Sequence, residues 1–330
     1  MRPRLYPVLT QSDLSVEKKD MNSLNNILVV IDPNDEAQNA LARAVVLAKA
    51  SGASVTAFLS IYDFSYEMTT MLSIAERDAM RKAVVEDREL WIKDIISENF
   101  SDGIDIFVNV LWHNRPFEAI IETVIKQDYD LVVKGTHTHD TLKSIIFTPT
   151  DWHLLRKCPC PVLLVKEMEW AKDGRILAAV HTGSDAGHHK ALNDKIIQES
   201  FYLANLVSAQ VHMVNSFPGT PVNIAIEIPE FDPTEYNTVV KQHHEEAMNE
   251  LANQYDISKD RIHIDEGLPE DVIPEVSSAI DAELLVIGTI GRTGFSAAII
   301  GNTAEHVLDR INSDVLAIKP DGYVSPLAEV

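Results

Sequence analysis

Cysteine and basic residues are scarce in this sequence. Its 330 residues include only two cysteines, Cys158 and Cys160, with a single proline between them. A disulfide framework is therefore excluded, and a reducing, cytoplasmic setting is favoured. Lys and Arg total 28 against 50 Asp and Glu, a formal net charge of −22. That charge repels phosphate backbones and anionic lipid heads, so nucleic-acid and membrane-surface binding are disfavoured.

Long apolar runs are also missing. No stretch approaches the roughly 20 apolar residues of a membrane helix, and residues 1–20 lack the apolar core of a secretion signal, so we expect no membrane insertion. The chain does have 45% hydrophobic residues. At roughly 100–200 residues per domain, its length suggests about two domains, each with its own core.

The sequence repeats itself once. Residues 130–136 (DLVVKGT) match residues 283–289 (ELLVIGT) at a shift of 153 positions, and the same shift aligns residues 160–166 (CPVLLVK) with 313–319 (SDVLAIK). A shared period of this size indicates two copies of one domain in tandem.

Each copy alternates short β-branched runs with amphipathic stretches of helical length, which predicts an α/β fold with a parallel sheet covered on both faces. We expect strands near 27–32, 54–61, 105–112, 130–135 and 161–166, and again near 175–180, 209–215, 261–265, 283–288 and 314–319. The expected helices lie near 36–50, 73–99, 116–127, 142–157, 189–207, 235–255, 270–281 and 302–312.

These patterns divide the chain into five parts. Residues 25–166 and 175–320 form the two domains, and residues 321–330 form a tail. The short polar linker 167–174 should hold the domains together, with their sheets edge to edge. Residues 1–24 match neither copy, so they are either a mobile leader or a segment ahead of a natural start at Met21.

A glycine-rich segment follows the fourth strand of the second copy. Gly288, Gly291 and Gly301 lie there, and Gly301 precedes Asn302 and Thr303 at the start of a predicted helix. Glycine lets a backbone approach a ligand closely, and a helix N-terminus attracts anions. Open α/β sheets bind ligands at this edge. The glycines therefore either cradle a phosphate, with Arg292 as a nearby cation, or simply form turns.

The spacing Gly288-x2-Gly291-x9-Gly301-Asn302 resembles the nucleotide-binding signature of the universal stress protein superfamily, and both copies look like members over roughly residues 26–320. The resemblance implies two doubly wound five-stranded parallel sheets of strand order 3-2-1-4-5, paired like a dimer. It also implies a role in surviving stress. By analogy the phosphate would meet Gly291, Gly301, Asn302 and Thr303, with Gly288 and Thr289 beside the sugar and His181 near the base.

Each copy keeps only part of that signature. ATP-binding members use an acidic residue just after the first strand; the first copy has Asp32 there, whereas the second has His181. Conversely, the first copy has Thr138 and Thr148-Pro149 where the second has Gly291 and Gly301-Asn302. Because proline has no amide hydrogen and threonine adds a Cβ, the second copy is the better phosphate site.

Three functions remain open. The first is a stress factor that senses ATP or another phosphorylated ligand in the second domain and signals to a protein partner. The others are a slow ATPase acting as a conformational switch, and a nucleotide-free scaffold. Sequence motifs of proteases, P-loop enzymes and dinucleotide-binding folds are absent.

A zinc site is a separate hypothesis. His137 and His139 alternate along the chain, so in an extended segment both imidazoles would point to one side, with Asp140 close by. The alternative is a solvated loop.

Overall fold

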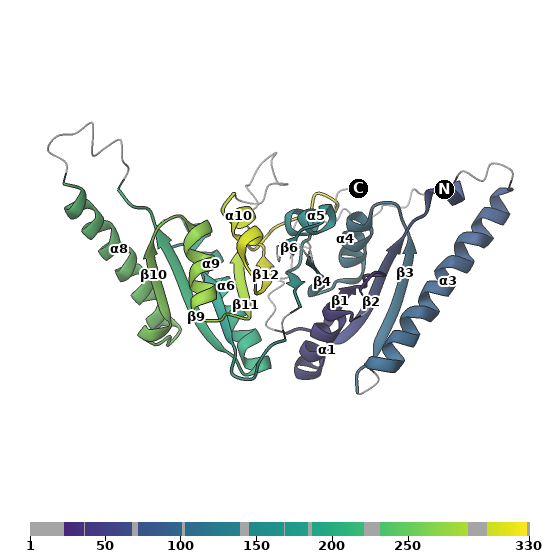
Figure 1. Cartoon of the computed structure of the whole chain (residues 1–330), viewed down its shortest axis with the longest axis horizontal. Helices are drawn as coiled ribbons and strands as arrows, with labels where there is room; N and C mark the ends of the chain where they lie inside the picture. Colours follow the sequence, from purple (N-terminus) through teal and green to yellow (C-terminus); the bar gives the residue numbers. More distant parts are fainter. Residues whose placement is uncertain are drawn as a thin grey trace, which may run out of the picture.

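The computed structural model describes residues 23–35, 37–67, 72–100, 103–138, 145–167, 169–183, 187–220, 232–289 and 302–328. The side chains of residues 66, 67, 137, 138, 145, 146, 188, 302 and 303 fall outside this description. The chain folds into two halves, each a sheet with helices on both faces, and the halves splay apart like a V (Figure 1).

The first half contains the strands β1 (Asn26–Val30), β2 (Ser54–Ile61), β3 (Ile106–Trp112), β4 (Leu131–Gly135) and β7 (Val162–Val165). Its helices are α1 (Asn39–Ser51), α2 (Phe64–Glu67), α3 (Ile74–Asn99), α4 (Pro116–Gln127) and α5 (Pro149–Lys157). A small hairpin is formed by β5 (His137–Thr138) and β6 (Ile145–Ile146).

The second half contains the strands β8 (Arg175–Ala179), β9 (Gln210–Phe217), β10 (Ile262–Glu266), β11 (Leu284–Gly288) and β12 (Asp314–Ile318). Its helices are α6 (Gly187–Val207), α8 (Pro233–Gln254), η1 (Lys259–Arg261), α9 (Pro269–Ala279) and α10 (Asn302–Arg310).

The main strands form one ten-stranded sheet in the order β10-β9-β8-β11-β12-β7-β4-β1-β2-β3. Every neighbouring pair within a half is parallel, so the predicted α/β class with two five-stranded parallel layers is confirmed. Strands β7 and β12 pair antiparallel across the middle, with Leu163 opposite Leu316. The two copies therefore pair edge to edge within one chain.

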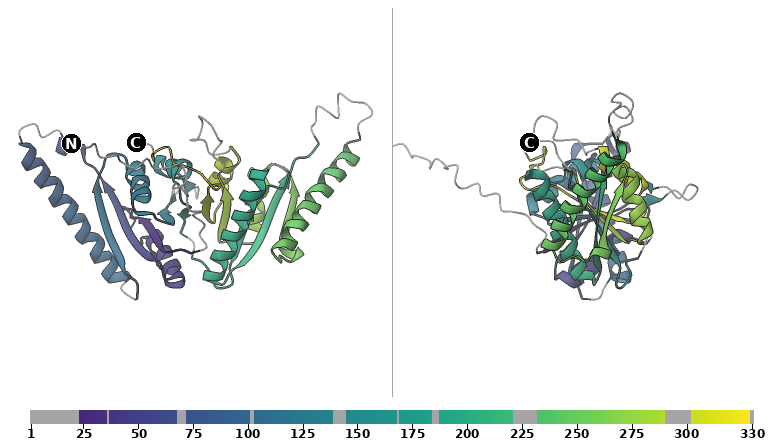
Figure 2. Two further views of the ribbon diagram at one scale, coloured as in Figure 1. Left: turned by 180° about the vertical axis from the view of Figure 1, so that it is seen from behind. Right: turned by 90° about the vertical axis from the view of Figure 1, so that its left-hand side faces the viewer.

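Strands β1, β4, β8 and β11 are buried on both faces and rich in Val, Ile and Leu, which is why their sequences read as continuous apolar runs. Two apolar clusters fill the spaces on the two faces of the sheet. The left-hand view in Figure 2 shows the long helices α3 and α8 at the outer ends of the V.

Charged groups cross the boundary between the halves. Arg43 on α1 forms an ion pair with the fully buried Asp314 of β12, 3.0 Å from Nε to Oδ2, and the backbone N–H of Lys166 donates to Asp314 Oδ1 at 2.8 Å. The Nζ atoms of Lys166 and Lys319 donate to carbonyls of the opposite half, those of Ile311 and Leu155. Burial lowers the pKa of Lys166 to about 7 and that of Lys319 to about 8.

One predicted helix was wrong at its start. The helix expected near 142–157 begins only at Pro149, because residues 145–146 pair with residues 137–138 as β6 and β5. A capping box fixes the start: the Thr148 hydroxyl accepts from the backbone N–H of Asp151, and the Asp151 carboxylate accepts from the backbone N–H of Thr148. Pro149 at the first helical position suits this geometry.

Candidate functional site

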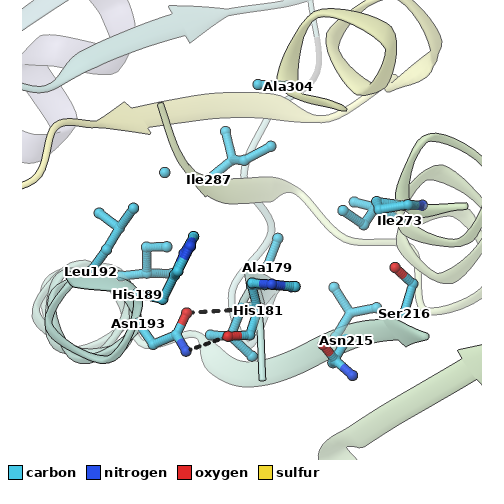
Figure 3. Close-up of a pocket in the computed structure, with 15 residues that line it drawn as sticks. Ala179, His181, His189, Leu192, Asn193, Asn215, Ser216, Ile273, Ile287 and Ala304 are labelled. Atoms are coloured by element: carbon cyan, nitrogen blue, oxygen red, sulfur yellow. Dashed lines mark hydrogen bonds between the residues drawn. The ribbon is translucent and has the colours of Figure 1, made fainter. Parts of the chain in front are cut away.

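A cavity of about 320 Å³ opens in the second half at the carboxyl ends of β8, β9 and β11, between helices α6, α9 and α10 (Figure 3). This is the edge at which open parallel sheets bind ligands. Its walls are mostly apolar, and it is lined by Ala179, Val180, His181, His189, Leu192, Asn193, Ile196, Val214, Asn215, Ser216, Pro269, Ile273, Ile287, Gly288 and Ala304.

His181 is held at the cavity by Asn193 of α6. The Asn193 side chain accepts a hydrogen bond from the His181 backbone N–H at 3.0 Å and donates one to its carbonyl at 2.9 Å, as the dashed lines in Figure 3 show. The His181 ring meets the edge of His189, 5.1 Å between centroids. Burial lowers the pKa of His181, so its imidazole is neutral at neutral pH. A neutral imidazole can stack on a base or bond a hydroxyl.

A second side-chain amide fixes the next residue. Asn215 of β9 accepts from the backbone N–H of Thr182 at 3.2 Å and donates to Nδ1 of His244 at 2.9 Å. This bond assigns the proton of neutral His244 to Nε2. Burial, with His243 and His181 as neighbours, lowers the pKa of His244. Both asparagines therefore shape the end of the cavity rather than present free amides to a ligand.

Helix α10 begins at Asn302, and its third residue, Ala304, is buried and lines the cavity. The first turn of a helix carries unpaired N–H groups and a partial positive charge. Ala304 has no side-chain acceptor to satisfy them. Gly291, Arg292 and Gly301 lie outside the described residues, as do the side chains of Asn302 and Thr303.

Gly288 and Thr289, the remaining predicted site residues, mainly make packing contacts and hydrogen bonds within the protein. A Cβ on Gly288 would lie 2.7 Å from Cδ2 of Leu192 and 3.0 Å from its Cγ, so the close packing of α6 on β11 favours glycine. Thr289 is buried, and both its N–H and its hydroxyl donate to the carbonyl of Ile318. Thus Gly288 and His181 line the cavity, whereas Thr289 does not.

The first half has a cavity of about 240 Å³ at the equivalent edge. Strand register establishes the correspondence: Val30 pairs with Lys134 on β4, and Ala179 pairs with Ile287 on β11. Asp32 thus corresponds to His181, and Lys134 to Ile287. The third residue of α5, Asp151, corresponds to Ala304, the third residue of α10.

The differences between the two halves at these positions change the chemistry at the N-termini of α5 and α10. In the first half Lys134 and Asp151 form a buried ion pair, 2.7 Å from Nζ to Oδ1. The other carboxylate oxygen of Asp151 accepts from the N–H of Thr148 at 2.7 Å and from its hydroxyl at 2.8 Å. The N-terminus of α5 therefore already holds an anion, whereas the equivalent end of α10 has Ile287 and Ala304 beside it.

The residues of the predicted zinc site lie outside the described part of the structure, because His139 and the side chain of His137 are not described. Among the described residues, no group of three or more His, Cys, Asp or Glu side chains could hold a metal ion. Cys158 and Cys160 are buried, form no disulfide and have their Sγ atoms 3.6 Å apart. None of the described helices combines the length and the apolar character needed to cross a membrane.

Sequence reasoning missed Asn193, Asn215 and the Lys134–Asp151 pair. The asparagines gave no local signal, since their roles depend on helix and strand packing. The ion pair did leave a signal, because the 153-residue repeat aligns Lys134 with Ile287 and Asp151 with Ala304.

The fold defines a tandem class of α/β protein, in which each of two parallel-sheet domains has a cavity at the carboxyl ends of its strands. The model of the universal stress protein family matches residues 23–166 and 174–319, so the chain belongs to that family, in two tandem copies. It is 50% identical over 308 residues to Universal stress protein E of Escherichia coli strain K12, covering 93% of this chain and 98% of that one. A Haemophilus influenzae homolog of Universal stress protein E is 42% identical, covering 89% and 97%.

Solved structures agree with the fold. A putative universal stress protein from Pseudomonas aeruginosa UCBPP-PA14 superposes with a TM-score of 0.69 at 32% identity, covering 91% of this chain and 95% of that one. A protein described as functionally unknown, from Pseudomonas aeruginosa PAO1, gives a TM-score of 0.70 at 31% identity, covering 91% and 94%.

Proposed function

We propose that this chain is a stress-response factor that binds ATP or a similar phosphorylated ligand in the cavity of its second half. The observation that carries the proposal is the replacement of the Lys134–Asp151 pair by Ile287 and Ala304. This replacement leaves the end of α10 without the internal carboxylate that occupies the end of α5.

We place the ligand by combining the cavity with the family signature. By analogy with the family, the phosphates contact Gly291, Gly301, Asn302 and Thr303 at the start of α10, and Arg292 supplies a cation in a strongly acidic protein. The base lies among apolar walls such as Ile273 and Ile287, with the neutral ring of His181 and the ring of His189 at its edge. A cytoplasmic setting and a protein partner that reads the bound state belong to the same proposal.

Binding without efficient hydrolysis is the favoured form. No Asp or Glu is among the described residues that line this cavity, so none of these residues supplies a carboxylate base to activate water. A slow ATPase is therefore the weaker candidate. The nucleotide-free scaffold has one specific observation in its favour, namely that His181 replaces the acidic residue of the family signature.

Thermal denaturation with and without ATP tests the proposal. A ligand at 100 times its Kd adds about 2.7 kcal/mol to the free energy of unfolding, which raises Tm measurably. We expect ATP to raise Tm in the unmodified chain and mass spectrometry to recover nucleotide from gently purified protein. No shift together with no recovered nucleotide would favour the scaffold.

A further inference from the structure

Strand β3 ends the ten-stranded sheet on the side of the first half, as β10 does on the side of the second (Figure 1). The backbones of Asp105 and His113, which flank β3, form hydrogen bonds to β2. Since successive residues of a strand alternate in direction, the backbone groups of Ile106, Val108 and Val110 point away from β2. Among the described residues these groups have no hydrogen-bond partner on that side, so β3 presents an open edge.

The two faces of β3 differ in how they are covered. The side chains of Ile106 and Val108 pack against the apolar cluster that contains Ile92 of α3. On the other face, Phe107 is 58% exposed and Leu111 is 37% exposed. The described residues that line a cavity of about 430 Å³ beside Phe107 include no charged side chain. The strand therefore combines an open edge with exposed apolar side chains, a combination that natural sheets normally avoid.

The other outer strand does not share this apolar face. Strand register places Arg261 and Asp265 in the second half where the first half has Phe107 and Leu111. Charged side chains are one of the means by which natural proteins protect a sheet edge. Because the two halves share one fold, that fold does not require the apolar side chains of β3.

The sequence around β3 is complementary to itself when its direction is reversed. Antiparallel pairing of two copies about Asn109 places Phe107 of each copy opposite Leu111 of the other. The remaining opposed pairs are Asp105 with His113, Ile106 with Trp112, and Val108 with Val110. In this register the open backbone groups of Val108 and Val110 face each other as a hydrogen-bonded pair. Apolar side chains thus meet apolar ones, and a carboxylate meets an imidazole.

The chain already contains a contact of this kind. Strands β7 and β12 join the two halves as antiparallel edge strands, with Leu163 opposite Leu316. We propose that two copies of the chain associate through β3, antiparallel and about a two-fold axis at Asn109, so that their sheets become continuous. A contact between identical surfaces closes after two copies. The inference does not depend on ligand binding in either half.

Sedimentation equilibrium of the full chain measures the association, and we expect a reversible dimer. Phe107→Asp with Leu111→Asp removes the apolar pairs and sets like charges opposite each other. The Kd of the dimer should then rise at least about a hundredfold. Val239→Asp with Leu268→Asp is the matched control, because it adds the same charges at two exposed apolar side chains of the second half. This control should remain a dimer.

A single introduced cysteine tests the register. Asn109→Cys places two thiols opposite each other on the two-fold axis, at a separation that a disulfide can bridge. We expect oxidised glutathione to give a covalent dimer on a non-reducing gel. Phe107→Cys is the matched control, because it lies opposite Leu111 rather than opposite itself, and it should not cross-link. The native cysteines are buried, and the unmodified chain measures their background.

Circular dichroism and Tm confirm that each variant is folded. A monomer at every concentration of the unmodified chain, or species larger than a dimer, would overturn the inference. So would a dimer that survives the two aspartates in β3, an equal loss of the dimer in the second-half control, or equal cross-linking of the two cysteine variants.

Discussion

Lys134 on β4 and Asp151 on α5 form a buried ion pair, 2.7 Å from Nζ to Oδ1, at the position where the second half has Ile287 and Ala304. The same fold therefore presents two different helix ends: a carboxylate caps α5, whereas the described residues at the equivalent positions beside α10, Ile287 and Ala304, carry none. This difference between two copies of one domain explains why we assign phosphate binding to the second.

Removing one member of this pair should destabilise the chain more than removing both. Lys134→Ile leaves a buried carboxylate unpaired, at a cost of about 3–5 kcal/mol in the free energy of unfolding. In Lys134→Ile with Asp151→Ala the charge is gone and mainly the helix cap is lost, about 1 kcal/mol. Urea denaturation measures both. Additive losses from the two single changes would show that the groups are not coupled.

The glycines that end β4 and β11 should respond differently to alanine. Gly288→Ala places a Cβ against Leu192, and we expect a loss of about 1–3 kcal/mol in unfolding free energy from overpacking. Gly135→Ala is the matched control, because its Cβ would lie 4.0 Å from that of Ala40, an ordinary contact. Urea denaturation curves give the unfolding free energy of both variants, and an equal loss in both would contradict the packing explanation.

A pair of histidines should make the protein sensitive to acid. His212 on β9 and His263 on the edge strand β10 lie 3.1 Å apart, Nδ1 to Nε2, with Arg175, Arg261 and Asp260 nearby. Burial, followed by the neighbouring His263, lowers the pKa of His212 from its ordinary 6.5 to about 4.

Acid destabilises the folded chain because the unfolded chain takes up a proton at His212 more readily. Below pH 6.5 the unfolded chain binds a proton at His212 that the folded chain does not bind until about pH 4, so stability is complete above pH 6.5 and is lost as pH falls toward 4. The loss should approach about 3 kcal/mol, since one pKa unit corresponds to about 1.4 kcal/mol. His212→Thr, the residue of the first copy at this register, should flatten the profile of urea midpoint against pH. His243→Thr, at an exposed histidine, serves as the control. A flattened profile in this variant as well would show that the acid sensitivity does not come from His212.

Much of the fold was predictable because buried parallel strands leave a strong apolar signal. Strand β2 lies at the predicted residues 54–61, and helix α4 at the predicted 116–127. The hairpin β5–β6 was not predicted, since two-residue strands carry no periodicity and Ile145–Ile146 reads equally well as helix. The position of His181 and Gly288 in the family signature was enough to predict them as site residues. Asn193 could not be predicted from the sequence, because its role depends on how α6 packs beside β8.

The most direct measurement of the central claim is a calorimetric titration of ATP into the unmodified chain and into the chain with Ile287→Lys and Ala304→Asp. The site described above predicts ATP binding at the second half of the unmodified chain, and its loss in the variant, in which an internal carboxylate caps α10. Ile287→Leu with Ala304→Ser, which adds no charge, should keep binding within about threefold, a difference of under 1 kcal/mol. ATP binding that survives the charged exchange undiminished, or no binding by the unmodified chain, would contradict the claim.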